Sequence, residues 1–541
     1  MNKWTAVAVL GSAQFVMVLD STVMNVSIST VVTDLDTTVA AMQSAITFYT
    51  LTMAAVMLLG AKLGDVWGRR RAFVIGAIVY SCGSLLTALS PNFVVLFLGW
   101  SVVEGLGAVL VIPAIAALVA ENYRGSDRVT AYAIIGAVSG AAVAAGPLIG
   151  GYVTTYLNWR YVFVSEVVIM IGVVLTARLI ADNSRPSSSR IDVPSVLLSA
   201  AGLVLVVYGM LQSKTWGWIL PKQAPEINGN PIEPLGLSLV PYLILLGAFL
   251  LVLFSGRQRR LAETGRAPLL DIGLFSITQL RSGLSVLGAQ YAFTAGVFFM
   301  IPIYLQMTLG LNALETGLKI FPLSIALILF SVVGTRLSTL WSPRRIVRVG
   351  QVVLVGSAAC LLGSVSLDLK SVVFGIGMFT AGAALGLLAS QLGNVNMSSV
   401  GEEKTSEVGG LQGVFQNLGS SLGTALIGSV LIASLSSSFF GSVESSSLPD
   451  TVKSAVSTQT EAGIAIVPVS SVARIATDAG LSSTDSAALT TIYSESQVSS
   501  LRVSFFALIL FALGSLLFSR NIPNKTVARR QGKTREAQQS P

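Results

Sequence analysis

The stretch FVVLFLGWSVVEGLGAVLVIPA (residues 93–114) contains a single charged residue, Glu104, in an otherwise apolar run. As a helix, it is long enough to cross the roughly 30 Å of hydrocarbon in a bilayer. Apolar runs of this length recur along the 541-residue chain, which is 53% apolar and 11% charged; soluble domains have about 25% charged residues. The sequence therefore predicts an all-α membrane protein with many spans.

Fourteen candidate spans can be placed along the chain, and an even number puts both chain ends on one side of the membrane. Loops on that side hold most of the lysines and arginines, whereas the opposite loops hold only Lys214, Lys222, Lys370, Lys453 and Arg474. The positive-inside rule then predicts a multi-pass cell-membrane protein with both termini cytoplasmic. The predicted spans are 5–31, 41–61, 72–89, 93–120, 130–153, 160–181, 193–212, 237–255, 283–307, 314–335, 347–367, 372–398, 408–434 and 500–519.

Three carboxylates lie inside these apolar spans: Asp20, Glu104 and Glu166. Each costs roughly 2.5 to 3.5 kcal/mol on insertion scales when it lies at the centre of a membrane helix, so we expect a function for them. The chain contains no histidine, and protons handled within the membrane would therefore be carried by these acids. Alternatively, each acid accepts hydrogen bonds from Ser, Thr or Trp neighbours and never titrates.

A faint internal repeat indicates a duplicated bundle. The turn AKLGDVWGRRR (61–71) and the turn TRLSTLWSPRR (335–345) share a basic residue, Leu, Trp and two arginines in an ungapped alignment, and repeats of this kind are typical of secondary transporters. We expect an N-terminal six-helix bundle over 1–190, an inserted helix pair over 191–260, and a C-terminal six-helix bundle over 261–541 with a cytoplasmic tail. The Ser- and Thr-rich segment 435–499 is predicted to be extracellular, as a mobile loop or as a short amphipathic helix over the outer mouth.

Several motifs together resemble one transporter family. LGDVWGRRR (63–71) is similar to the cytoplasmic turn of the major facilitator superfamily. LDSTVMNVSIS (19–29), AGPLIGG (145–151), WRYVF (159–163) and PLLDIGLF (268–275) resemble, in order and spacing, motifs of its fourteen-helix drug:proton antiporter family. The resemblance implies a major facilitator fold, with two six-helix bundles and two additional transmembrane helices between them, and export by alternating access.

The sequence departs from that family at two spans. The family pattern places Arg at Ser101 and Gln at Glu104, so a buried cation has been lost and a carboxylate gained. It also places Asn at Glu166. These replacements suggest a carboxylate relay for proton coupling in place of the proton-arginine mechanism of the family.

The resemblance also assigns roles to two motifs. Asp65, Gly68, Arg69 and Arg70 would form a gating turn, although any arginine run beside a span also satisfies membrane orientation. Gly146, Pro147, Gly150 and Gly151 would form the antiporter motif, the alternative being an ordinary glycine-rich helix. A substrate cavity is expected to include the polar and aromatic residues Asn25, Trp100, Arg160, Gln290, Tyr291, Phe298, Gln412, Gln416 and Asn417.

The expected function is a proton-coupled antiporter that exports amphipathic, cationic or zwitterionic drugs, with antibiotic resistance as the outcome. A dedicated exporter of one metabolite or lipid precursor is the alternative. A membrane sensor would need a large cytoplasmic domain, and an enzyme would need a nucleophile, metal ligands or a phosphate loop, none of which the sequence offers. Small amphipathic substrates, protons and membrane lipids are the expected partners of a monomer, with no nucleic acid, no metal and no cofactor besides the coupling proton.

Overall fold

A computed structural model describes residues 3–182, 191–227, 230–401, 404–459 and 464–524. Within that part of the chain, fourteen helices are long and apolar enough to cross a membrane. The prediction of an all-α membrane protein with fourteen spans is confirmed. The strands of the described part are the two-residue β1 (Glu226–Ile227) and β2 (Asn230–Pro231), which pair antiparallel.

Six spans form the N-terminal half. The fourth is continuous through α4, η1 and α5, of which η1 is a π-helical segment. The elements are α1 (Thr5–Asp34), α2 (Val39–Trp67), α3 (Arg69–Ala88), α4 (Phe93–Leu96), η1 (Phe97–Glu104), α5 (Gly105–Asn122), α6 (Gly125–Tyr156), α7 (Arg160–Thr176) and the short η2 (Ala177–Leu179).

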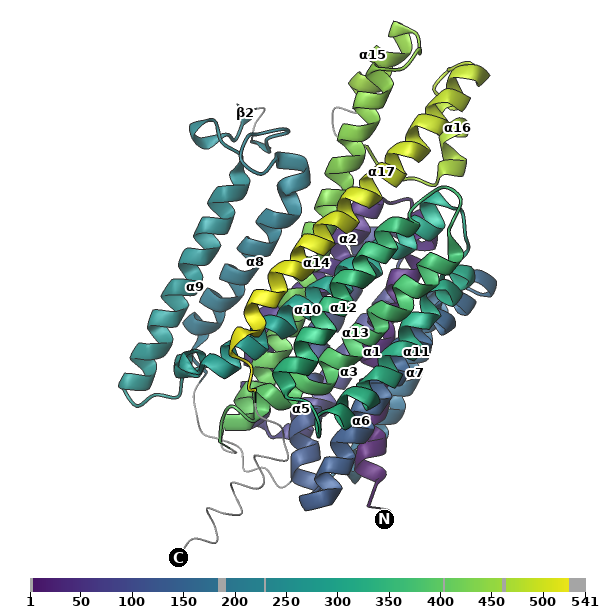
Figure 1. The fold of residues 1–541 in the computed structure, drawn as a ribbon. Helices are drawn as coiled ribbons and strands as arrows, with labels where there is room; N and C mark the ends of the chain where they lie inside the picture. Colours follow the sequence, from purple (N-terminus) through teal and green to yellow (C-terminus); the bar gives the residue numbers. More distant parts are fainter. Residues whose placement is uncertain (1–2, 183–190, 228–229, 402–403, 460–463, 525–541) are drawn as a thin grey trace, which may run out of the picture.

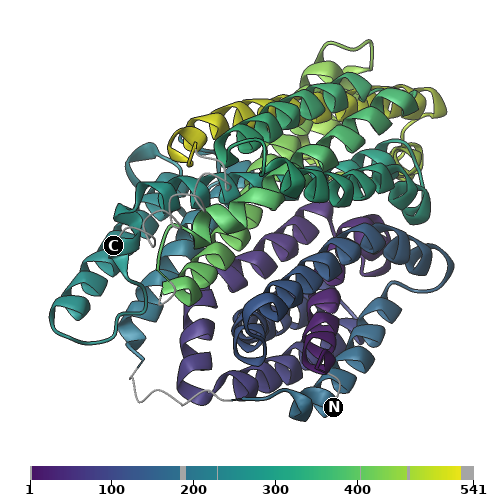
Figure 2. The same cartoon turned by 60° about the horizontal axis from the view of Figure 1, so that its bottom comes forward.

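Six further spans form the C-terminal half, which Figure 2 shows in green and yellow beside the purple and blue N-terminal half. The elements are η4 (Ile272–Ser276), α10 (Thr278–Pro302), the π-helical η5 (Ile303–Thr308), α11 (Ala313–Leu337), α12 (Pro343–Ser364), α13 (Ser371–Met397), α14 (Thr405–Glu444), α15 (Asp450–Gln459), α16 (Val469–Asp478), α17 (Ser483–Ser515) and η7 (Leu516–Asn521).

Helices α8 (Val193–Trp216) and α9 (Leu239–Glu263), joined through η3 (Pro234–Gly236), are the inserted pair. They pack on each other and stand beside the bundles (Figure 1). Helix α8 contacts α2 and α14, where Lys214 Nζ donates to Gln43 Oε1 over 2.9 Å. Gln43 in turn donates to the carbonyl oxygens of Thr424 and Ala425. The insert is therefore attached where the two halves meet.

The helix starts follow from local sequence. Asn312 and Glu315 form a capping box at the start of α11, and Ser342 caps α12 with Pro343 in its first turn. A cap satisfies backbone N–H groups that have no partner inside the helix, and proline tolerates the first turn because it lacks that N–H. Turn chemistry and apolar length therefore agree on where these spans begin.

The two faces of the bundle are distinguished by the chain ends. We call the face where α1 begins and α17 ends the terminal side, and the opposite face, which carries α15 and α16, the loop side (Figure 1). Each span can then be followed from one named side to the other.

The segment 435–499 is helical over most of its described residues. Helix α14 continues to Glu444, α17 already begins at Ser483, and α15 and α16 lie between them, projecting beyond the bundle (Figure 1). Phe439, Val443 and Tyr493 are buried between these extensions. Hydropathy detects only the lipid-spanning part of each helix, which is why the sequence placed the spans at 408–434 and 500–519. The described residues of the segment form a helical extension of the C-terminal half. The sequence predicted either a mobile loop or a short amphipathic helix there.

Candidate functional site

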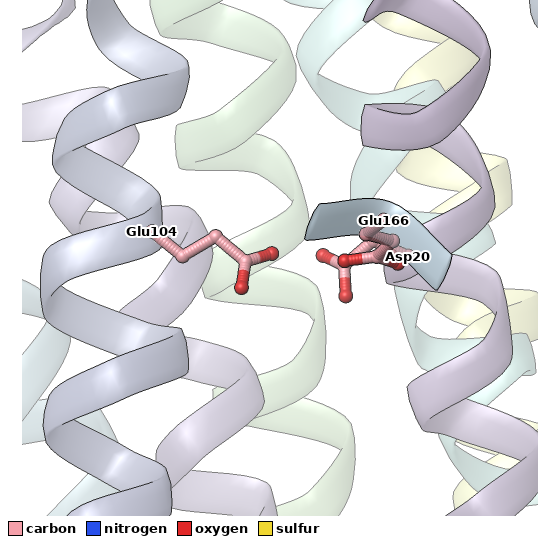
Figure 3. Close-up of side chains that lie close together, drawn as sticks. All are labelled: Asp20, Glu104 and Glu166. Carbon is pink, nitrogen blue, oxygen red and sulfur yellow. The ribbon is translucent and has the colours of Figure 1, made fainter. Parts of the chain in front are cut away.

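Asp20, Glu104 and Glu166 come together in the N-terminal half, and all three are 0% exposed. They reach the site from α1, from the last residue of η1 and from α7 (Figure 3). Each offers a carboxylate oxygen such that these atoms all lie within 4.8 Å of one another. The sequence predicted that each acid had a function; the tertiary structure makes them one group, which we call the acid cluster.

Close packing of α3 on the fourth span positions Glu104. A Cβ on Gly83 would lie 2.5 Å from the backbone nitrogen of Glu104, and a Cβ on Gly76 would lie 2.7 Å from Leu110 Cβ. Glycine is the residue that permits backbones to approach this closely. The π-helical turn of η1 ends at Glu104 itself, and such turns are frequent at functional sites.

Neutral side chains surround the acid cluster: the hydroxyls of Tyr49 and Tyr80 face Asp20 and Glu104, and Trp100 and Ser84 are hydrogen-bonded to the acids. Trp100 Nε1 lies 3.0 Å from both Asp20 oxygens. Ser84 Oγ, from α3, lies 3.0 Å from Glu104 Oε2 and 3.2 Å from Glu166 Oε2. The second oxygen of each glutamate, Oε1, is buried without a hydrogen-bond partner among the described residues. The cluster therefore has unused capacity for protons.

The charge of the cluster has no counterion among the described residues. None of the ion pairs in that part of the chain involves Asp20, Glu104 or Glu166. Two unit charges about 4 Å apart repel by roughly 4 kcal/mol at an effective dielectric constant near 20. The Ser84 hydroxyl carries one proton, so it either shares that proton between the two glutamates or accepts a hydrogen bond from one of them that is protonated. The arrangement suits a group that holds protons.

A set of three carboxylates is also a donor set for a hard cation, because hard cations prefer oxygen ligands. The sequence predicted no metal site, since it interpreted the acids as proton carriers and found two isolated cysteines and no histidine. The structure brings together oxygens from three acids that could hold a cation. Proton and cation occupancy therefore both need a direct test.

A cavity of about 1270 Å³ lies between the two halves. Within the described part of the chain, its wall contains polar, aromatic and aliphatic side chains and no Asp, Glu, Lys or Arg. Among the residues that the sequence assigned to a substrate cavity, the lining includes Asn25, Trp100, Gln290, Tyr291, Phe298, Gln416 and Asn417.

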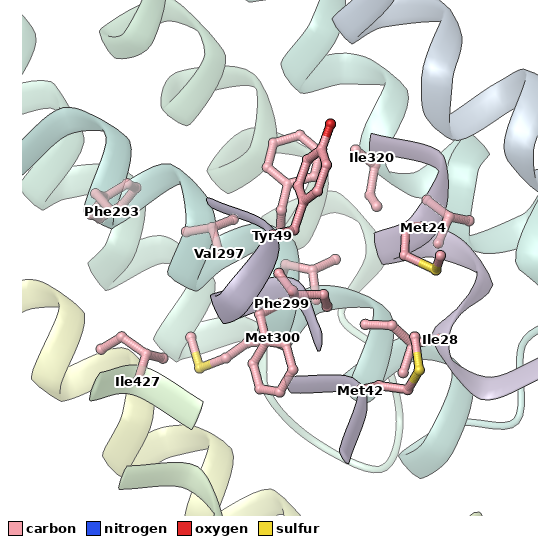
Figure 4. Packing of buried hydrophobic residues seen from close by; sticks show 14 of the residues in the cluster. Met24, Ile28, Met42, Tyr49, Phe293, Val297, Phe299, Met300, Ile320 and Ile427 are labelled. Carbon is pink, nitrogen blue, oxygen red and sulfur yellow. The ribbon is translucent and has the colours of Figure 1, made fainter. Parts of the chain in front are cut away.

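An apolar layer separates this cavity from the loop side. It contains Met24 and Ile28 of α1, Met42 of α2, Phe299 and Met300 of α10, Ile320 of α11 and Ile427 of α14, all at most 2% exposed (Figure 4). We call these residues the loop-side plug. On each of these helices a plug residue lies nearer the loop side than the cavity residues do; Met24 alone is level with the last cavity residue of α1, Asn25, and Ile28 lies beyond it. Cavity residues near the terminal side, such as Tyr132 and Val332, are 42% and 52% exposed, so the cavity faces the terminal side.

Two residues assigned to the cavity lie elsewhere. Arg160 pairs with Asp34 at the loop side and donates to the carbonyl oxygen of Ser90. Its position at the start of α7 puts it beside the end of α1 and away from the cavity wall. Gln412 donates to the carbonyl oxygen of Gly393 on α13. It shares a face with Gln416, but lies one turn closer to the terminal end of α14, where it contacts a helix and not the cavity.

The turn that the resemblance assigns to gating lies at the terminal side, between α2 and α3. Gly68 has φ 91°, a conformation that favours glycine and allows α3 to begin directly at Arg69. Arg69 forms ion pairs with Asp65 (3.7 Å) and with Glu121 at the end of α5 (2.7 Å). Arg70 donates to the carbonyl oxygen of Ile180. These contacts link the terminal ends of four spans within the N-terminal half.

The glycines of the antiporter motif contact two other helices. A Cβ on Gly146 would overlap Thr22 of α1, and one on Gly150 would lie 2.9 Å from Val23 Cγ1. A Cβ on Gly151 would lie 2.6 Å from the carbonyl oxygen of Ala313, on α11. Pro147 lies within α6, and its carbonyl oxygen faces Gly317 of α11. The motif therefore allows close packing of α6 on α1 and across the interface between the halves.

Sequence reasoning missed Ser84, Tyr80 and Tyr49, which surround the acid cluster. Tyr49 stacks on Trp100 with ring centroids 4.8 Å apart and an angle of 10° between the planes. The spacing of Gly76 and Gly83, seven residues apart on α3, marks one helix face for close packing and could have indicated that Tyr80 and Ser84 face the fourth span. Nothing in the sequence connects Tyr49 with Trp100.

The fold and the site define a class of protein: two helical bundles around a central cavity, closed toward one side, form the architecture of a secondary transporter. The chain belongs to the Major Facilitator Superfamily, whose profile it matches over residues 10–424. Since the proteins of this family are transporters, the chain is a transporter and not an enzyme.

Comparison with known proteins gives relatives across most of the chain. Puromycin resistance protein pur8 of Streptomyces alboniger is 29% identical over 435 residues, covering 79% of this chain and 82% of the relative. The probable actinorhodin transporter of Streptomyces coelicolor is 26% identical, covering 82% of this chain and 75% of the relative. The drug efflux pump JefA of Mycobacterium tuberculosis is also 26% identical, with coverage of 82% and 84%.

Among solved structures, a bacterial homologue of the human lysosomal transporter Spinster, in an inward-facing and unoccupied conformation, superposes with a TM-score of 0.60. It covers 96% of this chain and 97% of its own, at 17% identity. This likeness concerns the fold alone.

Proposed function

We propose that the protein exports amphipathic drugs in exchange for protons, by alternating access of one central cavity. The observation that carries the proposal is a cluster of three buried carboxylates next to a large cavity lined by polar, aromatic and aliphatic side chains. Names of relatives support the class of substrate, since they include a puromycin resistance protein and a drug efflux pump.

Proton coupling is supported by the chemistry of the acid cluster. Deprotonation of the acids would leave negative charge behind the cavity wall, which favours a substrate with a positive group. Protonation removes that attraction and favours release. Because no charged side chain lines the cavity in the described part of the chain, the attraction would act through the wall, and the polar and aromatic lining would accept varied amphipathic shapes.

Alternating access is supported by the two kinds of interface between the halves. The loop-side plug is apolar and includes residues of both halves, so it can separate without leaving unpaired charges. When the plug separates, few hydrogen bonds between the halves would break. They include those from Gln43 to the carbonyl oxygen of Thr424 and from Gln306 to the carbonyl oxygen of Val26. The gating turn, with Asp65 and Arg69 at the opposite end, would engage the C-terminal half when the terminal side closes.

The orientation of the protein follows from its charge. The arginine-rich gating turn and Arg336, Arg344 and Arg345 lie at the terminal side, which the positive-inside rule assigns to the cytoplasm. The cavity would then open to the cytoplasm in this conformation, and the expected substrate would enter from the cytoplasm or the inner leaflet.

A second candidate is export of one natural compound. Two relatives are named for a single compound, the probable actinorhodin transporter and the cephamycin export protein CmcT of Amycolatopsis lactamdurans. A dedicated exporter would share the acid cluster and differ in which lining residues contact its substrate. A narrow transport profile across a compound panel would favour this candidate.

Transport into proteoliposomes tests the proposal directly. The purified protein is reconstituted, a pH gradient is imposed, and uptake of ethidium and puromycin is measured with and without a sodium gradient. We expect uptake driven by the pH gradient alone, and we expect Glu104→Gln to reduce it to the level of protein-free vesicles. Glu444→Gln is the matched control, because Glu444 is exposed at the loop-side end of α14.

Three results would contradict the proposal. Uptake driven only by the sodium gradient would show that the coupling ion is sodium and not the proton. Unchanged uptake in Glu104→Gln would remove the cluster from the coupling mechanism. Absence of transport across a broad panel of amphipathic compounds, in protein that remains folded, would exclude drug export.

A further inference from the structure

We propose that the stacked pair of Trp100 and Tyr49 is a gate between the acid cluster and the cavity, and that Trp100 must leave Asp20 before a proton can pass. The inference rests on the proposed function, because it takes the acids to be the groups that exchange protons. It concerns a different residue and a separate step, namely how water in the cavity reaches the acids.

The first observation is that the acids are sealed from the cavity. Asp20, Glu104 and Glu166 are each 0% exposed, and none of them lines the cavity. A carboxyl group exchanges protons with solvent only through water or a chain of hydrogen bonds that reaches it. In this conformation, some side chain must move before water in the cavity can touch the acids.

Trp100 and Tyr49 are the side chains that separate the acid cluster from the cavity. Trp100 and Tyr49 both line the cavity, yet they are only 1% and 2% exposed. Trp100 also donates its indole N–H to the Asp20 carboxylate, at 3.0 Å from both oxygens. One indole therefore contacts the cavity and the acid cluster at the same time, and its stacking on Tyr49 closes the space beside it.

The third step concerns how the gate responds to charge. A hydrogen bond to a carboxylate is about twice as strong as one to a neutral group, so Trp100 is held in place when Asp20 is ionised. Transfer of a proton to Asp20 from Glu104 or Glu166, within the cluster, weakens that bond and releases the indole toward the cavity. A substrate that displaces the indole has the converse effect, because it exposes Asp20 to cavity water. Substrate entry and proton exchange would then be linked through one side chain.

Other groups around Asp20 bear on this response. The titratable side chains that face it are Glu104 of η1, Glu166 of α7, Tyr49 of α2 and Tyr80 of α3. No basic side chain forms an ion pair with any of the three acids in the described part of the chain. The proton content of Asp20 therefore depends on the two glutamates, and the gate responds to the charge of the whole cluster.

Infrared spectroscopy tests the gate without a substrate. The purified protein is moved from H₂O into D₂O, and the rate at which the carboxylic acid C=O band shifts reports how fast water reaches the protonated acids. The band is assigned by its loss in Asp20→Asn, Glu104→Gln and Glu166→Gln. We expect Trp100→Ala to accelerate the exchange roughly ten- to a hundredfold, the factor that corresponds to one hydrogen bond to a charged group.

Two further variants keep the test decisive. Trp100→Phe retains an aromatic ring on Tyr49 and removes the N–H, so it should fold and should still exchange faster than the unmodified protein. Trp159→Phe is the matched control. Trp159 is 1% exposed, and its Nε1 also donates to a carboxylate oxygen, Asp34 Oδ2, at 3.0 Å. Unlike Trp100, it does not line the cavity. Its exchange rate should equal that of the unmodified protein.

The outcomes separate this inference from the proposed function. If the band of the three acids exchanges at the same rate in both Trp100 variants and in the unmodified protein, Trp100 is not a gate. The proposed proton role of the acids would not be affected by that result. An equal acceleration in Trp159→Phe would also overturn it, by showing general loosening. A spectrum with no carboxylic acid band from these residues at any pH would overturn the proton role of the acid cluster itself.

Discussion

At the scale of single residues, the acid cluster depends on one hydroxyl. Ser84 Oγ bonds to both Glu104 and Glu166, which come from different spans. The glycine spacing of α3 could indicate that Ser84 faces the fourth span, but not that it bonds to two glutamates 20 and 82 residues away. The acids themselves could be chosen, since each is costly inside an apolar span.

Ser84→Ala should therefore lower both stability and proton-driven transport. The change leaves two buried carboxyl groups without this partner, which costs about 1–3 kcal/mol. The melting temperature in detergent and the rate of uptake into proteoliposomes measure the two effects. Ser81→Ala is the matched control on the same helix, because Ser81 Oγ donates only to the carbonyl oxygen of Ala77. Equal losses in the two variants would contradict a role for Ser84 in the acid cluster.

At the scale of elements, the inserted pair is secured at both ends. Lys214 attaches the loop-side end of α8 to Gln43. At the terminal side, Asp192 caps α8 through the backbone nitrogen of Ser195 and accepts hydrogen bonds from Arg257 of α9 at 2.6 and 2.7 Å. The hydrogen bonds from Arg257 hold the pKa of Asp192 well below its usual range.

The Asp192–Arg257 contact predicts a defined pH dependence. An aspartate has a pKa of about 3.9 in the unfolded chain. Because the pKa of Asp192 is lower in the folded protein, its contribution to stability is complete above the unfolded pKa and is lost as the pH falls through the folded pKa. Asp192→Asn should thus lower the melting temperature at pH 7, and the difference from the unmodified protein should shrink as the pH falls below about 4. Thermal unfolding of both proteins over a pH series measures this difference.

The control for this contact is a second ion pair at the terminal side. Lys3 and Asp127 pair at 3.2 Å, with side chains 62% and 45% exposed, and exposed pairs contribute little. Asp127→Asn should therefore change the melting temperature at pH 7 less than Asp192→Asn does. If the melting-temperature difference between Asp192→Asn and the unmodified protein is as large in acid as at pH 7, the lost contact does not depend on the charge of Asp192.

At the scale of the whole molecule, the cavity and the loop-side plug divide the protein into an open and a closed end. The same helices supply both: α1, α2, α10, α11 and α14 contribute residues to the cavity and, nearer the loop side, to the plug. A conformational change that closed the terminal side would have to separate the plug, since each helix takes part in both. Access from the two sides should therefore be mutually exclusive.

Labelling of single cysteines tests both access and orientation. In a background of Cys82→Ala and Cys360→Ala, a membrane-impermeant maleimide should label Thr335→Cys from the terminal side, and should fail to label Met42→Cys in the plug from either side. Ser445→Cys, exposed beyond the end of α14, should be labelled from the loop side. Labelling of Thr335→Cys in intact cells and not in inverted vesicles would reverse the proposed orientation.

The sequence by itself determined the membrane class, the number of spans and the identity of the three acids. These follow from local properties: apolar length against bilayer thickness, and the cost of a carboxylate in lipid. Its span limits were too short for α14 and α17, because hydropathy does not follow a helix into water.

Only the tertiary structure decided which residues meet. Ser84 joins the acids because glycines on α3 allow it to approach the fourth span. Arg160 falls outside the cavity because α7 begins at the loop side, and Gln412 because it lies one turn nearer the terminal end of α14 than Gln416 does. Contacts of this kind depend on the distance between backbones of separate helices, a quantity that is not encoded in the pattern of any single span.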